Sequence, residues 1–243
     1  MKIKYLAILL LILGSCTNKH KYVAVPFEEK EINDWENPEI FGINKEAPRA
    51  SFIPYLKDDD VLRDTAENSS FYTSLNGQWE FNLAIKPTER PFYFFKEDYD
   101  TSDWKKIKVP ANWELEGFDV PIYTNVKYPH EKTPPKIQEH YNPVGSYRTY
   151  FNIENLEDDK EVYIHFGAVS SAMYIWVNGK KVGYSQGSKT PAEFNITSYL
   201  KKGENLLAVE VYRWSDGSYI EDQDFWRLSG ITRDVYLLKR EKT

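Results

Sequence analysis

The strongest structural signal in the sequence is a β-hairpin, written Met173-Tyr174-Ile175-Trp176-Val177-Asn178-Gly179-Lys180-Lys181-Val182-Gly183-Tyr184. Two runs rich in β-branched and aromatic residues flank the dipeptide Asn178-Gly179. Asn and Gly both accept the positive φ angles of a type I′ turn, and the twist of this turn matches that of two paired strands. The segment therefore predicts antiparallel strands over 173–177 and 180–184, joined by a two-residue turn.

Further strand signals continue on both sides of this hairpin, and turn signals separate them. They occupy residues 78–83, 105–109, 147–153, 162–166, 205–214 and 234–239. No helical stripe extends beyond about two turns. About eight strands in this order predict an all-β domain, a jelly-roll β-sandwich, over residues 71–240.

In two long segments the apolar residues recur with neither the period of a helix nor that of a strand. Residues 16–70 are polar and then rich in Pro, Asn and Asp, so we expect a tether and an extended arm that docks through Asp34-Trp35-Glu36-Asn37-Pro38. Residues 111–143 contain five prolines, together with aromatic residues such as Trp113 and Tyr128. A loop of this length inside a compact domain is usually functional or disordered. Its aromatic content favours a packed, functional loop.

The composition excludes several classes of protein. The 243 residues carry 37 acidic and 31 basic side chains, a net charge of −6, so there is no basic stripe for nucleic acid. Aromatic residues make up 16%. Their rings pack on the C–H faces of sugars but also fill β-rich cores, and composition alone favours the core. No phosphate-binding loop, zinc-protease motif or nucleophile elbow occurs, and the four histidines form no catalytic motif.

The N-terminus has the features of a secretory signal. Two lysines precede a nine-residue apolar run, 5–13, that is too short to span a bilayer. The run Leu13-Gly14-Ser15-Cys16 resembles a bacterial lipoprotein box, so residues 1–15 are predicted to be a lipoprotein-type signal peptide and Cys16 the lipidated residue. The alternative is an ordinary signal with an incidental cysteine. Because Cys16 is the sole cysteine, disulfides and a cysteine nucleophile are excluded. Membrane contact is expected only through the lipid.

The densest polar cluster is RWSDGSYIEDQDFWR, residues 213–227, directly after a predicted core strand. Loops at strand ends commonly carry binding sites, and carboxylates bind sugar hydroxyls and hard cations. An equally good interpretation is a charged loop whose acids pair with Arg213, Arg227 and Arg233. Glu221 and Asp224 are a poor pair for glycoside hydrolysis, because neighbours in one loop rarely face a sugar from opposite sides.

Several motifs occur in an order that is typical of one family. They are DWENP (34–38), SLNGQW (74–79), VPANW (109–113), PIYTNV (121–126), NPVGSY (142–147), VGYSQ (182–186), RWSDGSY (213–219) and WRLSGI (226–231). Together they resemble glycoside hydrolase family 2, in the branch of the large bacterial β-galactosidases. The resemblance spans about residues 34–238.

The resemblance implies that this chain is the family's N-terminal jelly-roll sugar-binding domain. The (β/α)₈ barrel with both catalytic glutamates would lie outside it, so no catalytic residue is assigned and the chain alone is expected to be inactive. Asn125 matches a position whose amide contacts the galactosyl group. Asp216 matches a position that contacts galactose hydroxyls and helps to ligate Na⁺. The other Na⁺ ligands and the Mg²⁺ ligands of the full-length enzyme would also lie outside this chain, and the arm could contribute to a homo-oligomer.

The leading hypothesis is the sugar-binding domain of an exported β-galactosidase, lipid-anchored in the periplasm or outer membrane. Its partners would be galactose or a β-galactoside and the missing catalytic domains, without nucleic acid. The alternative is a free-standing envelope galactoside-binding protein without catalysis, and an inert structural sandwich also stays open. A β-glucuronidase or β-mannosidase would use the same first domain, but WSDGSY, residues 214–219, is the galactosidase-like version of its loop.

Overall fold

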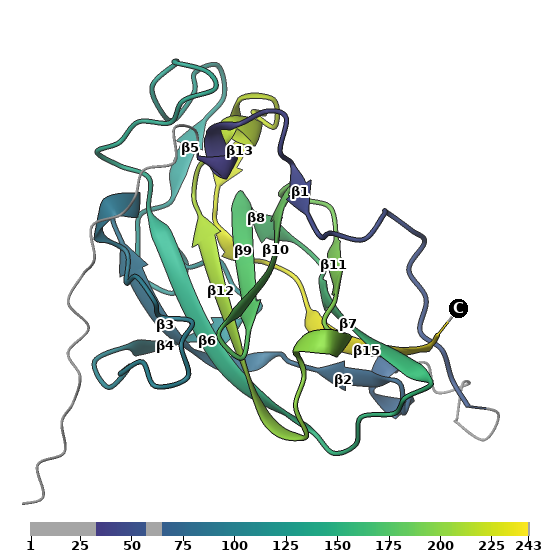
Figure 1. Ribbon diagram of the computed structural model, residues 1–243. Helices are drawn as coiled ribbons and strands as arrows, with labels where there is room; N and C mark the ends of the chain where they lie inside the picture. Colours follow the sequence, from purple (N-terminus) through teal and green to yellow (C-terminus); the bar gives the residue numbers. More distant parts are fainter. Residues whose placement is uncertain (1–32, 57–64, 243) are drawn as a thin grey trace, which may run out of the picture.

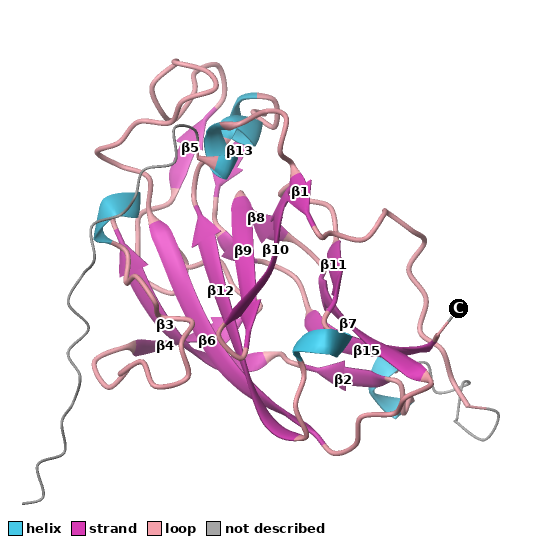
Figure 2. Cartoon of the chain, in the orientation of Figure 1, coloured by secondary structure: helices cyan, strands magenta, loops and turns pink. Residues whose placement is uncertain are grey.

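The chain folds into two antiparallel β-sheets that pack face to face (Figure 1). The computed structural model describes residues 33–56 and 65–242. Strands dominate, and each 3-10 helix in this part of the chain has only three or four residues (Figure 2). The predicted all-β sandwich with an extended N-terminal arm is confirmed.

The larger sheet has seven strands, and each strand is antiparallel to its neighbours. In order across the sheet they are β1 (Gly42–Ile43), β10 (Lys180–Gln186), β9 (Ala172–Val177), β12 (Gly203–Tyr212), β6 (Val144–Ile153), β3 (Gly77–Ala84) and β4 (Lys105–Val109). The predicted hairpin is confirmed as β9 and β10. Its turn residues have the positive φ angles expected, 49° at Asn178 and 78° at Gly179.

The second sheet and two short ribbons complete the fold. The second sheet consists of β11 (Ala192–Asn195), β7 (Lys160–Phe166), β15 (Val235–Glu241) and β2 (Tyr72–Ser74). The ribbons are β5 (Ile122–Thr124) with β13 (Phe225–Arg227), and β8 (Val169–Ser170) with β14 (Gly230–Ile231). The 3-10 helices are η1 (Asp34–Glu36), η3 (Ala66–Asn68), η4 (Pro87–Glu89), η5 (Thr197–Tyr199) and η6 (Asp216–Tyr219).

The strand predictions agree with the structure except at some boundaries and for the shortest strands. Each predicted segment contains a strand, but the one expected over 205–214 ends at Tyr212. The segment 111–143, expected to be irregular throughout, contains β5. The strands that the sequence does not reveal, β1, β2, β5, β8, β11, β13 and β14, are two to four residues long. Strands this short show no alternation, and only their partners stabilise them.

The main core lies between the two sheets. Alternate residues of β12, Leu207, Val209 and Val211, point into it and are fully buried. Ile164 and Phe166 of β7 pack against them from the opposite sheet. Both strands therefore turn alternate apolar side chains toward the core.

A second apolar cluster covers the outer face of the larger sheet. Trp35 of η1 stacks on Tyr212, with ring centroids 4.1 Å apart, and Phe95 stacks on Trp176 at 5.0 Å. The arm and the segment around residues 94–104 thus bury the outer face of the central strands. The docking predicted for residues 34–38 is confirmed, because Asp34, Trp35 and Glu36 are all buried.

Some of the predicted features belong to residues that the structure does not describe. The predicted signal peptide, 1–15, the lipidation site Cys16 and the start of the tether lie there. None of the helices in the described ranges has the length and apolar character needed to cross a membrane.

Farther along the arm, an ion cluster fastens it to the second sheet. Glu193 of β11 accepts hydrogen bonds from Arg49 of the arm at Nε (3.0 Å) and Nη2. Arg240 Nη2 lies 3.1 Å from the same carboxylate, and His165 Nδ1 lies at 3.3 Å. Burial by itself would raise the pKa of Glu193, but the hydrogen bonds from His165 and Arg49 and the charges of Arg49 and Arg240 lower it to about 2.

We expect Glu193→Gln to destabilise the chain by about 2 kcal/mol at pH 7, because two guanidinium groups lose their carboxylate. Since the folded-state pKa is depressed, the contribution of Glu193 is complete above its unfolded-state pKa and fades as the pH falls toward 2. Urea denaturation at pH 7 and pH 3 measures both effects. The matched control is Glu204→Gln, an exposed glutamate in β12. Equal stability of the two variants at pH 7 would contradict the assignment.

Candidate functional site

Two loops that are distant in sequence meet at one end of the sandwich. The long loop, residues 111–143, and the acidic loop, residues 213–229, pair through β5 and β13, with Tyr123 opposite Trp226. Figure 1 shows this ribbon beside the arm, at the end away from β2 and the C-terminus. The prediction that the long loop is packed is confirmed.

Arg213 holds the two loops together from inside. Its side chain is fully buried, and its Nη1 donates to Asp119 and to the hydroxyl of Tyr141 (2.9 Å). Its Nη2 donates to the carbonyls of Val120 (3.0 Å) and Arg227 (3.1 Å). These contacts satisfy the two terminal nitrogens and offset the cost of burying the charge, whereas Nε is buried without a hydrogen-bond partner among the described residues. The pairing expected within the acidic loop is found for Arg227 with Asp222, whereas the acids that face Arg213 come from the long loop.

Tyr219 fastens the tip of η6 to the long loop. Its hydroxyl accepts a hydrogen bond from the N–H of Thr133 (3.1 Å) and lies 2.8 Å from the carbonyl oxygen of Glu131 and 2.6 Å from that of Lys136. Tyr128 donates in turn to the carbonyl of Tyr219 at 3.2 Å. These contacts fix the backbone on both sides of the predicted site.

Asp216 begins η6 and is almost completely buried. Its Oδ1 accepts hydrogen bonds from Gln186 Nε2 (2.7 Å) and from the N–H of Gly217 (2.9 Å). Burial raises the pKa of Asp216, and the nearby charge of Glu36 adds to this rise, whereas the two hydrogen bonds oppose it. The carboxylate is thus held in a fixed orientation in a site where its charge is costly, a feature typical of binding sites.

Asn125 follows β5 directly and is exposed. The residue before it is anchored, since the carbonyl and hydroxyl oxygens of Thr124 accept hydrogen bonds from Arg227 at 3.3 and 3.1 Å. The structure therefore places Asn125 and Asp216 on two paired loops at the same end of the sandwich, one exposed and one buried.

The carboxylate of Asp216 is the group for which the sequence predicts a cation contact. The hard carboxylate oxygen of Asp216 suits Na⁺, and a cation would offset the cost of burying its charge. Among the described residues, no three His, Cys, Asp or Glu side chains gather closely enough to hold a metal ion.

Glu221 and Asp224 have structural roles in the acidic loop. Glu221 accepts hydrogen bonds from the N–H of Ser188 (2.9 Å) and from its hydroxyl. Asp224 accepts one from the hydroxyl of Tyr123. The two carboxylates thus contact different partners. This agrees with the expectation that Glu221 and Asp224 are a poor pair for glycoside hydrolysis.

Gln186 is a site residue that sequence reasoning did not identify. Its amide links Asp216 to the hydroxyl of Tyr184 (2.6 Å). The motif VGYSQ, 182–186, contains it, but only the fold brings the end of β10 beside η6.

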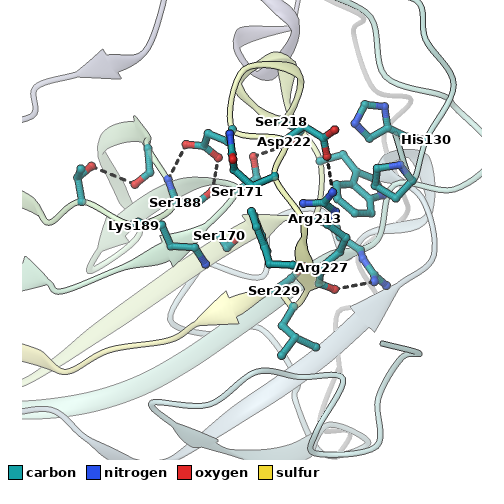
Figure 3. Close-up of a pocket in the computed structure, with 18 residues that line it drawn as sticks. His130, Ser170, Ser171, Ser188, Lys189, Arg213, Ser218, Asp222, Arg227 and Ser229 are labelled. Carbon is teal, nitrogen blue, oxygen red and sulfur yellow. Dashed lines mark hydrogen bonds and ion pairs between the residues drawn. The ribbon is translucent and has the colours of Figure 1, made fainter. Parts of the chain in front are cut away.

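A separate cavity of about 290 Å³ lies beneath the acidic loop (Figure 3). His130, Ser171, Ser188, Arg227 and Ser229 are among the residues of its wall. Neither Asn125 nor Asp216 lines it. The cavity is therefore distinct from the site predicted by resemblance.

Comparison with known proteins shows the family to which the chain belongs. The sequence profile described as "Glycosyl hydrolases family 2, sugar binding domain" matches residues 72–241. A β-galactosidase of Priestia megaterium is 49% identical over 209 residues, which cover 84% of this chain and 20% of that protein. A β-galactosidase of Vibrio cholerae is 46% identical over 207 residues, 85% of this chain and 20% of that protein. The chain thus spans about a fifth of the length of these relatives.

Solved structures support the same fold. A Bacteroides uniformis β-glucuronidase superposes with a TM-score of 0.51 at 24% identity, covering 69% of this chain and 18% of that one. At this identity the likeness supports the fold alone. The profile match, the identity to the β-galactosidases and the jelly-roll sandwich together establish that the chain belongs to glycoside hydrolase family 2 and carries the family's sugar-binding domain.

Proposed function

We propose that the chain is the N-terminal sugar-binding domain of an exported β-galactosidase and supplies substrate contacts to a catalytic barrel outside these residues. The main support is the identity of 45–49% to β-galactosidases over this domain. The identity to β-galactosidases also favours a galactoside as the substrate.

In this proposal the two loops act at the mouth of the barrel. The amide of Asn125 donates and accepts hydrogen bonds with the galactosyl group, as an exposed amide can. The carboxylate of Asp216 accepts from galactose hydroxyls and serves as one Na⁺ ligand. Its supports, Gln186 and the N–H of Gly217, orient it before the sugar arrives. Such preorganisation avoids the entropic cost of ordering the group on binding.

The alternative function is a free-standing galactoside-binding protein of the cell envelope. The two proposals differ in what the coding DNA contains beyond codon 243. A reading frame that continues into a barrel with two glutamates supports the enzyme domain. Unrelated sequence after a stop codon would favour the binding protein.

The proposed role of Asn125 can be tested by exchanging this domain into a related β-galactosidase. Residues 33–242 would replace the matching domain of the Priestia megaterium β-galactosidase, and hydrolysis of nitrophenyl β-D-galactoside would be measured. We expect an active chimaera in which Asn125→Ala lowers kcat/KM about 10–100-fold, because hydrogen bonds to the sugar are lost. The chain alone should show no turnover.

The control for Asn125 is Asn152→Ala, an exposed asparagine near the end of β6 that is away from the long loop. It should change kcat/KM less than about twofold. A folded but inactive chimaera, or equal effects of the two substitutions, would count against the proposal.

A second prediction separates the binding role of Asp216 from a structural one. Because burial raises the pKa of Asp216 in the folded chain, its ionised form opposes folding at neutral pH, and this opposition fades as the pH falls. We therefore expect Asp216→Asn to leave the free energy of unfolding equal or higher, by less than about 1 kcal/mol, at pH 7. The same substitution should lower the kcat/KM of the chimaera at least about tenfold.

Urea denaturation and galactoside hydrolysis measure these two effects, with the exposed Asp158→Asn as control. A variant that is destabilised by several kcal/mol would indicate that the carboxylate holds η6 together. Full activity of Asp216→Asn would likewise refute a role in binding.

We also propose that the protein is exported and anchored through lipid on Cys16, as the N-terminal sequence predicts. When the full chain is expressed in a bacterium supplied with radioactive palmitate, we expect a labelled, membrane-associated product. Cys16→Ser should abolish both the label and the association. An unlabelled wild-type chain in the soluble periplasmic fraction would show that the cysteine is incidental.

A further inference from the structure

Arg227 is the buried residue that holds the strand leading to Asn125. It ends β13, and β13 pairs with β5, the strand that ends one residue before Asn125. Its side chain reaches the last residue of β5, since Nη2 lies 3.3 Å from the carbonyl oxygen of Thr124 and 3.1 Å from its hydroxyl oxygen. The Arg227 side chain is only 4% exposed, whereas Asn125 is exposed. A buried cation thus fixes the backbone next to an exposed amide.

The guanidinium of Arg227 is itself held in one position. Asp222 forms an ion pair with Nη2, drawn in Figure 3, and the centroid of the Phe225 ring lies 4.5 Å from the guanidinium carbon. The main chain is fixed as well, because the carbonyl oxygen of Arg227 accepts a hydrogen bond from Nη2 of Arg213 at 3.1 Å. The Nε of Arg227 is buried without a hydrogen-bond partner among the described residues. The contacts with Thr124 and Asp222 are therefore the ones that orient the guanidinium.

The position of Asn125 depends on Arg227 because little else holds this part of the loop. Among the described residues, none forms a hydrogen bond or an ion pair with the Asn125 side chain. The strand β5 has only three residues, and a strand of this length is stabilised by its partners. On the other side of Asn125, Val126 is 84% exposed. Thr124 is therefore the neighbour through which the backbone of Asn125 is held.

Such anchoring matters for the recognition of a sugar. A hydrogen bond between an amide and a hydroxyl group weakens steeply when its distance or angle is distorted. A side chain on a fixed backbone also loses less entropy on binding. The planar guanidinium suits this role, because its rigid fork of N–H donors can bind a carboxylate and a neighbouring oxygen at the same time.

We infer that Arg227, with Asp222 as its counter-ion, is a positioning residue for Asn125. It holds Thr124 and thereby orients the Asn125 amide toward the galactosyl group, without touching the sugar itself. The inference rests on the proposed function, because it takes Asn125 as the sugar contact. Neither Arg227 nor Asp222 is among the site residues that the family resemblance implies.

Hydrogen exchange of the full chain, followed by mass spectrometry, tests the anchoring without any sugar. Arg227→Met keeps the length and the apolar stem of the side chain and removes its hydrogen bonds. We therefore expect the N–H groups of residues 122–126 to exchange about tenfold faster. Residues 72–74, in the three-residue strand β2 at the other end of the sandwich, should exchange as before. Unchanged exchange at 122–126 in the folded variant overturns the inference, whatever the role of Asn125.

The chimaera with the Priestia megaterium enzyme tests the effect on catalysis. Thr124→Val removes the hydroxyl that accepts from Arg227 and keeps the shape of the side chain, so it should lower kcat/KM about 3–10-fold. Thr124→Ser keeps the hydroxyl and should recover most of this loss. The matched control is Thr73→Val in β2, which should change kcat/KM less than about twofold. These mild substitutions also serve if Arg227→Met does not fold.

A double-mutant cycle separates positioning from a general structural role. If Arg227 acts through Asn125, neither Arg227→Met nor Thr124→Val should lower kcat/KM further in the Asn125→Ala chimaera. Losses that multiply overturn the inference while the sugar contact of Asn125 stands. Wild-type kcat/KM in the folded Arg227→Met and Thr124→Val chimaeras does the same. If Asn125→Ala alone has no effect, the proposed function fails and the inference fails with it.

Discussion

Burial of both faces of the central strands is the constraint on which the rest of the structure depends. In β12, Val209 and its alternate neighbours pack between the sheets, while Ala208 and Tyr212 lie in the cluster on the opposite face. Apolar surface left in water would cost about 25 cal/mol per Å². The arm therefore covers this face, with Trp35 stacked on Tyr212. The arm is thus part of the domain, and it brings η1 against η6, where Asp216 lies.

The loops at the end of the sandwich depend on a second constraint, the buried charge of Arg213. Asp119, Tyr141 and two carbonyls accept hydrogen bonds from its two terminal nitrogens and so offset the cost of burying the charge. The loss of one partner would leave a charge unpaired in a medium of low dielectric constant. The long loop and the acidic loop are consequently held in one arrangement. Recognition of hydroxyl groups requires such fixed positions, since hydrogen bonds weaken steeply when their geometry is distorted.

The parts of the fold that could be predicted are those whose signal is local. The turn at Asn178-Gly179 depends on the φ angles of two residues, and the alternation in β12 repeats within ten residues. The docking of the arm through residues 34–38 could be predicted, but the face that it covers could not, because alternation assigns one face of a strand to the core and leaves the other undefined. Tyr212 shows this difference: its place in a strand follows from the sequence, whereas its contact with Trp35 joins distant segments.

The same distinction applies to the candidate site. The sequence by itself determined the sheet-forming segments and the family resemblance, from which Asn125 and Asp216 are predicted as site residues, because these depend on residue identity and short-range order. Only the tertiary structure decided that β5 pairs with β13, that Gln186 orients Asp216, and that a cavity forms beneath the acidic loop. Each of these requires segments far apart in the chain to meet, and that meeting is set by the packing of the whole sandwich rather than by any local pattern.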